Sequence, residues 1–350
     1  MMVTPQDWPI YGHTTTIHFL QQITQPNNSG GHKQREPQHA YLLLGPRQVG
    51  KSTVARLFAR ALLCTDEHQR PCGRCRGCQL TLRGNHPDFR LIQPLDKNGE
   101  IDRVNGTLRT EQATEIVHDV ALRPMESRYK VFLIQDAHLA NDSFANKLLK
   151  TLEEPPAYAV FCLSALARSN LLPTIVSRCQ VLELRALAPQ TVIQALQAGW
   201  QVDAEKAELI GRLSQGRLGW AVDQLTYSDQ LQHRLDQLQS LWQLMRADPV
   251  DRLNFAEKGA TTFNSQQLFD LVNLWITWWR DLLLTHTRCE DACCNIDQMG
   301  ELKRQAGTLS LAQIRNYLHT LQRIEKYLQH TINVRLALEV LVLQMPSLSG

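Results

Sequence analysis

The sequence predicts an α/β domain built on a parallel sheet with helices on both faces, followed by an all-α region. Short apolar strands alternate with helical segments between Tyr41 and Cys162, an order typical of a parallel sheet covered by helices. A Gly-x-x-x-x-Gly-Lys-Ser loop separates the strand YLLLG from the helix that follows it. Beyond Pro189 the strand signal stops, and apolar residues recur every three to four positions, which indicates helices.

The elements follow from the residues in chain order. TTTIHFLQQI at residues 14–23 predicts a helix, and TQPNNSGGHKQREPQ at residues 24–38 predicts an exposed loop because Asn, Gly, Pro and charged residues dominate it. The apolar runs YLLLG, VFLIQ and YAVFCLS predict strands. We expect an α/β domain at residues 1–188, a small helical lid at 189–227 and a helical C-terminal domain at 228–350.

Composition and charge exclude several classes of protein. With 350 residues, 43% hydrophobic and 20% charged, the chain is of ordinary globular composition and has room for two or three domains. A net charge of +3 means that contact with nucleic acid would need a local basic patch. The N-terminal residues carry no export signal, and no apolar run reaches the roughly 18 residues of a membrane span. We therefore expect a cytoplasmic chain that does not enter a membrane.

The glycine-rich loop has the context that a phosphate-binding loop needs, between an apolar strand and an amphipathic helix. Its glycines let backbone N–H groups curl around phosphate oxygens, Lys51 supplies positive charge, and Ser52 can ligate Mg²⁺. We expect ATP or ADP, with Mg²⁺, as the ligand. The alternative is a loop that keeps this shape but has lost its ligand. The expected contacts are Gly45, Pro46, Arg47, Gln48, Val49, Gly50, Lys51, Ser52 and Thr53.

Four cysteines within residues 64–78 predict a zinc module. They follow the pattern Cys-x7-Cys-x2-Cys-x2-Cys, and four thiolates suit a closed tetrahedral Zn²⁺ site with a structural role. Redox chemistry is a poor rival because a dithiol needs only two cysteines. Cys162 is expected in the core, whereas Cys289, Cys293 and Cys294 lack metal-site spacing. The expected zinc ligands are Cys64, Cys72, Cys75 and Cys78.

Three segments together resemble a known family: HAYLLLGPRQVGKSTVARLFARALLC, YKVFLIQDAHLANDSFANKLLKTLEEPP and LLPTIVSRCQ. They look like the clamp-loader subunits of bacterial DNA polymerase III, within the AAA+ superfamily, and the similarity covers roughly residues 10–225. The C-terminal region matches only in being helical, as the family's oligomerising collar is. The resemblance implies a role in DNA replication, with gamma/tau and delta subunits as partners and with the sliding clamp and primed DNA reached through the assembly.

Two subunit types of this family share these motifs, the gamma/tau ATPase and the delta prime subunit. The ATPases have an Asp-Glu pair that holds Mg²⁺ and orients water, where this chain has Gln135 and Asp136. A register one residue later would leave Ala137 in the catalytic position, and hydrolysis would fail as well. The lid arginine of the ATPases aligns with Gly219, and their polar sensor falls at Ala165 or the next residue. The chain therefore resembles the delta prime type. The resemblance implies that it hydrolyses nucleotide poorly or not at all and has no polymerase site of its own. The alternative is a gamma/tau-type ATPase motor.

Arg178, in the family's Ser-Arg-Cys motif, is expected to act on a neighbouring subunit. The resemblance implies an arginine finger that enters the neighbour's nucleotide site and stabilises charge on the γ-phosphate. The alternative is an arginine that pairs with an acidic residue at the domain edge.

Three other features have plainer interpretations. Trp275, Trp278 and Trp279 lie at helical spacing and are expected in the core or a subunit interface and not as base-stacking platforms. His138 has no nearby nucleophile and is expected to be structural. A third function, a stand-alone zinc module or DNA-processing enzyme, has no carboxylate cluster or nucleophile–base pair to support it.

Overall fold

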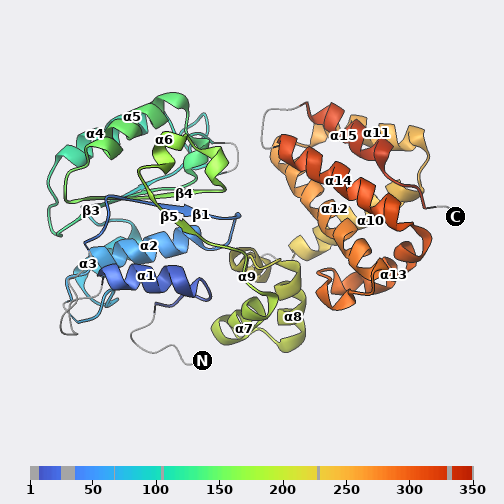
Figure 1. Ribbon diagram of the computed structural model, residues 1–350, viewed down its shortest axis with the longest axis horizontal. Helices are drawn as coiled ribbons and strands as arrows, with labels where there is room; N and C mark the ends of the chain where they lie inside the picture. Colours follow the sequence, from blue (N-terminus) through green and yellow to red (C-terminus); the bar gives the residue numbers. More distant parts are fainter. Residues whose placement is uncertain are drawn as a thin grey trace. The chain divides into compact units, whose positions relative to one another are not determined.

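The computed structural model describes residues 8–24, 36–66, 68–103, 106–226, 229–328 and 333–348 (Figure 1). These residues form two compact units. The N-terminal unit extends to Thr191 and includes Gly216–Gly219, and the C-terminal unit comprises Val192–Gln215 and the residues from Trp220 onward. The three-domain division at residues 188 and 227 stays a prediction. Most of the predicted loop at 24–38 lies outside the described residues.

The N-terminal unit contains a five-stranded sheet in the order β2-β3-β4-β1-β5, and every pair of neighbouring strands is parallel. Strands β1, β3 and β4 are buried along their whole length, which explains why, apart from Lys130 and Ser164, they are apolar and do not alternate. The parallel sheet is therefore confirmed. The strands are β1 (Ala40–Leu44), β2 (Phe89–Ile92), β3 (Lys130–Ile134), β4 (Ala159–Ala165) and β5 (Gln180–Glu183).

Helices cover both faces of this sheet (Figure 1). Alternate residues of β1 point to opposite faces, so Tyr41 and Leu43 pack with α1 and α2 while Leu42 and Leu44 pack with α4 and α5. The predicted first helix is confirmed, one residue longer than expected. The helices are α1 (Thr14–Thr24), α2 (Lys51–Leu62), α3 (Arg76–Arg83), α4 (Thr110–Ala121), α5 (Asp142–Glu153) and α6 (Pro173–Val176), with short 3₁₀ turns η1 (Ala137–Leu139) and η2 (Arg168–Asn170).

Beyond the sheet the described residues are helical, as the sequence predicts. The helix α8 belongs to the C-terminal unit, whereas α7 and α9 each contain residues of both units. The helices are α7 (Pro189–Trp200), α8 (Ala204–Leu213), α9 (Leu218–Thr226), α10 (Asp229–Arg246), α11 (Pro249–Thr262), α12 (Ser265–His286), α13 (Met299–Thr308), α14 (Leu311–Leu328) and α15 (Val334–Gln344), with 3₁₀ turns η3 (Glu290–Ala292) and η4 (Ile296–Gln298).

The core of the C-terminal unit forms around α12. Trp275, Trp278 and Trp279 are at most 1% exposed, so their faces are closed to a nucleic-acid base. Trp278 Nε1 donates to Gln305 Oε1 at 3.0 Å, and the Trp279 ring lies 4.5 Å from that of Tyr317. The prediction that these tryptophans are core residues is confirmed.

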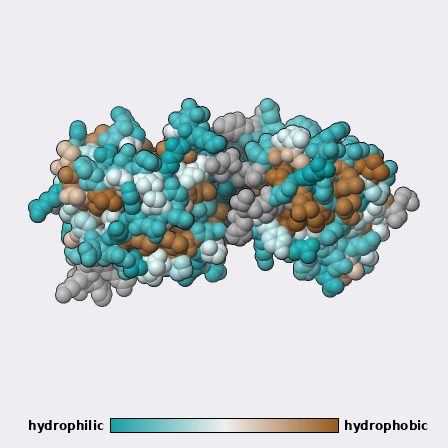
Figure 2. Space-filling view, turned by 90° about the horizontal axis from the view of Figure 1, so that it is seen from above, coloured by the Kyte–Doolittle hydropathy of each residue, from teal (hydrophilic) through white to brown (hydrophobic). Residues whose placement is uncertain are grey.

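The surface of the C-terminal unit carries a broad hydrophobic area in the view of Figure 2. Large apolar side chains exposed on its helices include Val250, Leu311, Tyr327, Leu336 and Leu343. Within the described parts of the chain, no helix is both long enough and apolar enough to cross a membrane.

Candidate functional site

The glycine-rich loop begins directly after β1 and ends at the first turn of α2. Gly45 has φ +151° and Gly50, the N-cap of α2, has φ +108°, conformations that favour glycine. A β-carbon on Gly45 would lie 2.1 Å from the Leu184 carbonyl oxygen, so no larger residue fits there. His13 Nε2 donates to the Val49 carbonyl at 3.0 Å and supports the loop from the N-terminal side.

Lys51 is held inside the loop. The residue is 6% exposed, and its Nζ donates to the carbonyl oxygens of Gly45 and Pro46, each at 2.7 Å. Burial lowers the pKa of Lys51 to about 8, while the charge of Asp136 opposes that shift. Among the described residues, the hydrogen-bond partners of this desolvated ammonium group are two neutral carbonyls, so it keeps its positive charge available for an anion.

The two residues after β3 are not arranged as a magnesium site. Gln135 is 1% exposed, and its Oε1 accepts from Gln93 Nε2 at 2.9 Å. The Asp136 carboxylate forms an ion pair with Arg103 at 2.9 Å, and the Asp136 amide donates to Ser164 Oγ at 3.0 Å. Mg²⁺ is ordinarily bound through carboxylate oxygens and water. With an amide at one position and a carboxylate already paired at the other, these residues do not fit the Mg²⁺ site of an ATPase.

His138 lies close to the same group of charges. Burial lowers the pKa of His138 to about 4, so the imidazole is neutral at physiological pH; the charges of Asp136, Arg47 and Lys51 act on it more weakly. Both ring nitrogens are buried without a hydrogen-bond partner among the described residues. Buried polar atoms in native structures ordinarily have partners.

Gly219 touches the phosphate loop directly. Its amide donates to the Gln48 carbonyl at 2.8 Å, and a β-carbon at position 219 would lie 2.7 Å from that oxygen. A lid arginine at this position would therefore collide with the loop. At the other expected sensor position, Ala165 is an apolar, fully buried residue.

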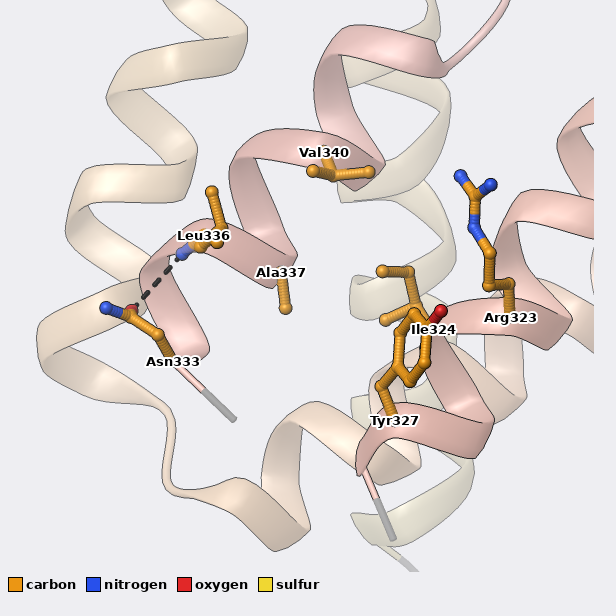
Figure 3. Close-up of a pocket in the computed structure, with 7 residues that line it drawn as sticks. All are labelled: Arg323, Ile324, Tyr327, Asn333, Leu336, Ala337 and Val340. Atoms are coloured by element: carbon orange, nitrogen blue, oxygen red, sulfur yellow. Dashed lines mark hydrogen bonds between the residues drawn. The ribbon is translucent and has the colours of Figure 1, made fainter. Parts of the chain in front are cut away.

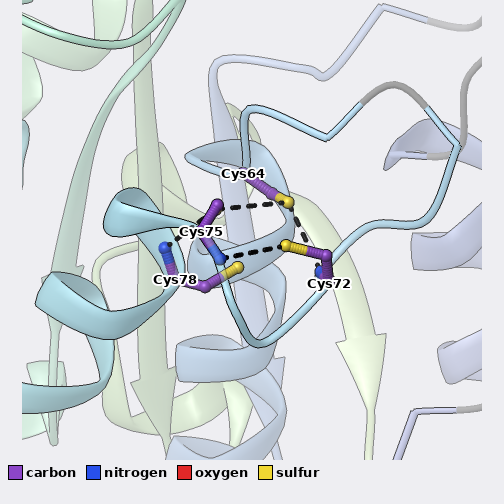
Figure 4. Close-up of side chains that lie close together, drawn as sticks. All are labelled: Cys64, Cys72, Cys75 and Cys78. Carbon is purple, nitrogen blue, oxygen red and sulfur yellow. Dashed lines mark hydrogen bonds between the residues drawn. The ribbon is translucent and has the colours of Figure 1, made fainter.

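The four cysteines of residues 64–78 come together as the spacing predicts (Figure 4). Their sulfur atoms all lie within 4.8 Å of one another, and those of Cys64 and Cys75 are 3.8 Å apart. Four sulfurs around a tetrahedral Zn²⁺ at about 2.3 Å would be about 3.8 Å apart. The amides of Cys72, Cys75 and Cys78 each donate to a cysteine sulfur. The cluster is thus able to bind a metal ion such as zinc.

The cysteine cluster is attached to the end of α2. Cys64 follows this helix almost directly, and the Cys78 thiol contacts the Arg60 carbonyl at 3.9 Å. A β-carbon on Gly77 would lie 2.4 Å from the Leu63 carbonyl oxygen, so α3 presses closely against the helix end. The helix that begins at the phosphate loop therefore ends at the cysteines.

The remaining cysteines are dispersed or structural. Cys162 is fully buried in β4, as predicted. Cys289 is exposed, whereas Cys293 and Cys294 are buried beside Asp281, whose carboxylate accepts from the Cys294 amide at 2.8 Å. Among the described residues, the only group of three or more His, Cys, Asp or Glu side chains placed to hold a metal is the four-cysteine cluster.

Arg178 lies just after α6 and is paired within the chain. Its Nη2 bonds to Glu153 Oε1 at 2.7 Å, and its Nη1 donates to the Thr174 carbonyl at 2.9 Å. The side chain is 32% exposed and that of Glu153 is 48% exposed. This is the ion pair that the alternative interpretation expects. Whether Arg178 enters a neighbouring subunit stays a prediction.

A groove lies between α14 and α15 in the C-terminal unit (Figure 3). Its volume is about 350 Å³, and residues of the two helices face one another across it. The lining includes Arg323 but no carboxylate, cysteine or histidine, so it offers no acid–base pair or metal ligands.

Four residues that contact the glycine-rich loop or the residues after β3 were missed by sequence reasoning. Gln93 and Arg103 lie between β2 and α4, in a segment without a motif, and His13 lies before α1. Of the four, Ser164 could have been predicted from the sequence, because it is a polar residue near the carboxyl end of β4. Carboxyl ends of neighbouring parallel strands meet at one edge of the sheet, so Ser164 is expected near the residues that follow β3.

Comparisons with known proteins agree with this geometry. Residues 21–188 match the family described as "DNA polymerase III, delta subunit". The tau/gamma subunit of Haemophilus influenzae is 39% identical over 48% of this chain and 23% of its own length. The delta' subunit of Pseudomonas aeruginosa is 39% identical over 40% of this chain and 41% of its own.

A longer match extends over most of the chain and therefore over residues of both units. The delta' subunit of Bacillus subtilis is 26% identical over 88% of this chain and 90% of its own length. The chain thus spans about a quarter of the tau/gamma relative but nearly all of this delta' relative. The sheet, the glycine-rich loop, the cysteine cluster and these matches lead to one conclusion: the chain is a homologue of the bacterial DNA polymerase III subunits delta' and tau/gamma.

Proposed function

We propose that this chain is a delta prime-type clamp-loader subunit, which holds nucleotide but does not hydrolyse it and helps to load the sliding clamp onto primed DNA. The observation that carries this proposal is the combination of an intact phosphate loop with Gln135 and an Asp136 already paired to Arg103. Hydrolysis needs an anionic metal ligand and a water-orienting group at these positions, and a displacement of about 1 Å can cost a hundredfold in rate.

The alternative within the family is a gamma/tau-type ATPase motor. A tau/gamma relative and a delta' relative are both 39% identical to this chain, over 48% and 40% of its length, so identity alone does not discriminate. The steric conflict at Gly219 and the apolar Ala165 both oppose hydrolysis. The long match to a delta' subunit supports the non-hydrolysing role.

The proposal assigns the nucleotide and the metal to separate residues of the N-terminal unit. The loop at residues 45–53 would hold the phosphates of ATP or ADP, with Lys51 as the charged contact. Cys64, Cys72, Cys75 and Cys78 would hold a structural Zn²⁺. We further propose that residues 189–227 act as the lid and 228–350 as the collar that joins gamma/tau and delta partners.

Arg178 would act on the nucleotide of a neighbouring gamma/tau subunit. Its bond to Glu153 joins two partly exposed side chains, and such pairs contribute only about 0–1 kcal/mol. The arginine can therefore exchange this partner for a phosphate at little cost. An arginine finger would explain why a chain without its own catalytic pair retains the Ser-Arg-Cys motif.

Reconstitution tests this function. The chain should assemble with its gamma and delta subunits and support clamp loading. Arg178→Ala should assemble normally yet slow the clamp- and DNA-stimulated ATPase, since arginine fingers in well-studied GTPases contribute about 10³ to 10⁵ in rate. Arg168→Ala is the matched control, because Arg168 is also a partly exposed arginine, paired with Glu183 at 3.0 Å. A loader that contains Arg178→Ala and loads clamps at the normal rate would refute the finger, and failure to assemble would refute the subunit role.

A further inference from the structure

The site around the glycine-rich loop contains a positively charged side chain, that of Arg103, which is not part of the loop motif. Arg103 Nε and Nη2 both lie 2.9 Å from Asp136 Oδ2, so the guanidinium contacts the carboxylate through two nitrogens. The Arg103 side chain is 45% exposed, whereas that of Asp136 is 11% exposed. The arginine therefore approaches from the solvent side and covers the carboxylate.

Lys51 and Arg103 carry two positive charges at this site, against the single negative charge of Asp136. Arg103 and Arg47 both act electrostatically on Lys51 and lower its pKa, while Asp136 raises it. Gln135 adds no charge, and the His138 imidazole is neutral. The formal charge is thus positive before any metal enters. Such a site repels a divalent cation and attracts the phosphates themselves.

We propose that Arg103 is the resident cation of this phosphate site, and that through it the site binds a nucleoside di- or triphosphate without a divalent metal. The proposal rests on the nucleotide binding inferred above and goes beyond it. For Mg²⁺ to reach Asp136, Arg103 would have to leave, and Gln135 would offer only a neutral amide oxygen in its place. The positive charge of Arg103 balances the phosphate charge that Mg²⁺ ordinarily balances.

The neighbouring His138 gives an independent sign that a ligand belongs here. Its two ring nitrogens are buried with no hydrogen-bond partner among the described residues, although Asp136, Arg47 and Lys51 are close enough to act on it. A phosphate oxygen or a ligand-bound water would supply a partner. Lys51 and Arg103 outweigh Asp136 in charge, so the site is positive. Beside it, the ring nitrogens of His138 have no hydrogen-bond partner among the described residues.

Titration of the full chain with a fluorescent ADP analogue tests this role, in excess Mg²⁺ and again in EDTA. The wild-type affinity should differ less than about threefold between the two conditions. Arg103→Ala should lose about tenfold or more in EDTA, the effect of one charge-assisted contact, and should recover affinity when Mg²⁺ is added because Asp136 is then open to the metal. Arg103→Lys, which keeps the charge, should retain most of the EDTA affinity.

Arg90→Ala is the matched control, since Arg90 is an exposed arginine that pairs with Asp119 on the same unit, and it should behave like wild type. Retained zinc content and circular dichroism would show that each variant is folded. The proposal fails if wild-type binding falls tenfold in EDTA, if Arg103→Ala binds normally in EDTA, or if no variant binds nucleotide. The first two outcomes leave the proposed function intact, whereas an absence of all nucleotide binding would also remove its nucleotide-holding part. The role in assembly and the Arg178 experiment do not depend on nucleotide in this chain's own site.

Discussion

Replacing Gly219 by alanine should disturb the phosphate loop, because the two backbones touch. A β-carbon at position 219 would lie 2.7 Å from the Gln48 carbonyl oxygen and 3.2 Å from the Gln48 β-carbon. The nearer atom belongs to the backbone, so the clash can be relieved only if the start of α9 or the loop moves. Overpacking of this kind costs about 1–3 kcal/mol. Strain on the 2.8 Å hydrogen bond from the Gly219 amide to Gln48 adds about 1 kcal/mol.

We therefore expect Gly219→Ala to lower the free energy of unfolding of the N-terminal unit by about 2–4 kcal/mol and to weaken nucleotide binding. Urea denaturation and titration with a fluorescent ADP analogue measure the two effects. Gly307→Ala is the control, because a β-carbon there meets nothing within 4 Å and alanine favours the helix α13. If Gly219→Ala unfolds and binds as the wild type does, the contact between position 219 and the loop is not the constraint described here.

Three further predictions concern the metal, the pH dependence and the catalytic pair. Carefully reduced protein should contain about one zinc per chain by metal analysis, and Cys75→Ser should release it and destabilise the N-terminal unit, since a structural site contributes its binding energy to folding. Nucleotide affinity measured by calorimetry should be constant from about pH 7 to pH 8, where the terminal phosphate is ionised, and should fall above pH 8, because burial lowers the pKa of Lys51 to about 8 and the neutral amine no longer attracts phosphate. Phosphate release by the lone chain should stay at background, and Gln135→Asp with Asp136→Glu should restore it only in part, because Gly219 supplies no lid arginine.

Each of these has an outcome that would contradict it. Reduced protein without zinc would remove the metal assignment. An affinity that is unchanged well above pH 8 would mean that Lys51 stays charged in the free protein or does not contact the phosphates. Strong turnover by the lone wild-type chain that Lys51→Ala abolishes would overturn the non-hydrolysing assignment and favour the gamma/tau-type motor.

The sequence predicts the parts of the fold that depend on local pattern. The strands β1, β3 and β4 are almost entirely apolar because both their faces are buried, and the cysteine spacing predicts the four thiols that come together. The strand β2 was not predicted, because it is only four residues long and contains the exposed Arg90. A short strand with a charged residue has no clear period of two.

The rest of the site depends on contacts between distant segments. Arg103 and Asp136 are 33 positions apart, and their pairing depends on the path of the segment between β2 and α4. Nothing in the residues around Arg103 marks it as part of a phosphate site. At Gly219 the sequence shows only the lack of an arginine, whereas the structure gives the steric reason, which is the nearby Gln48 backbone.

The glycine-rich loop before α2 and the cysteine cluster after it need contacts of different range along the chain. This difference should set the order in which the two form. The cysteines lie within residues 64–78, so their thiolates can gather around an ion while the rest of the chain is still open. The phosphate loop takes its shape only after distant strands have met, because Ala40 pairs with Phe161 and Tyr41 with Gln180. Contacts that close long loops form more slowly than local ones. We expect pulsed hydrogen exchange to show protection at the end of α2 before β1 during refolding with zinc, and simultaneous protection would contradict this order.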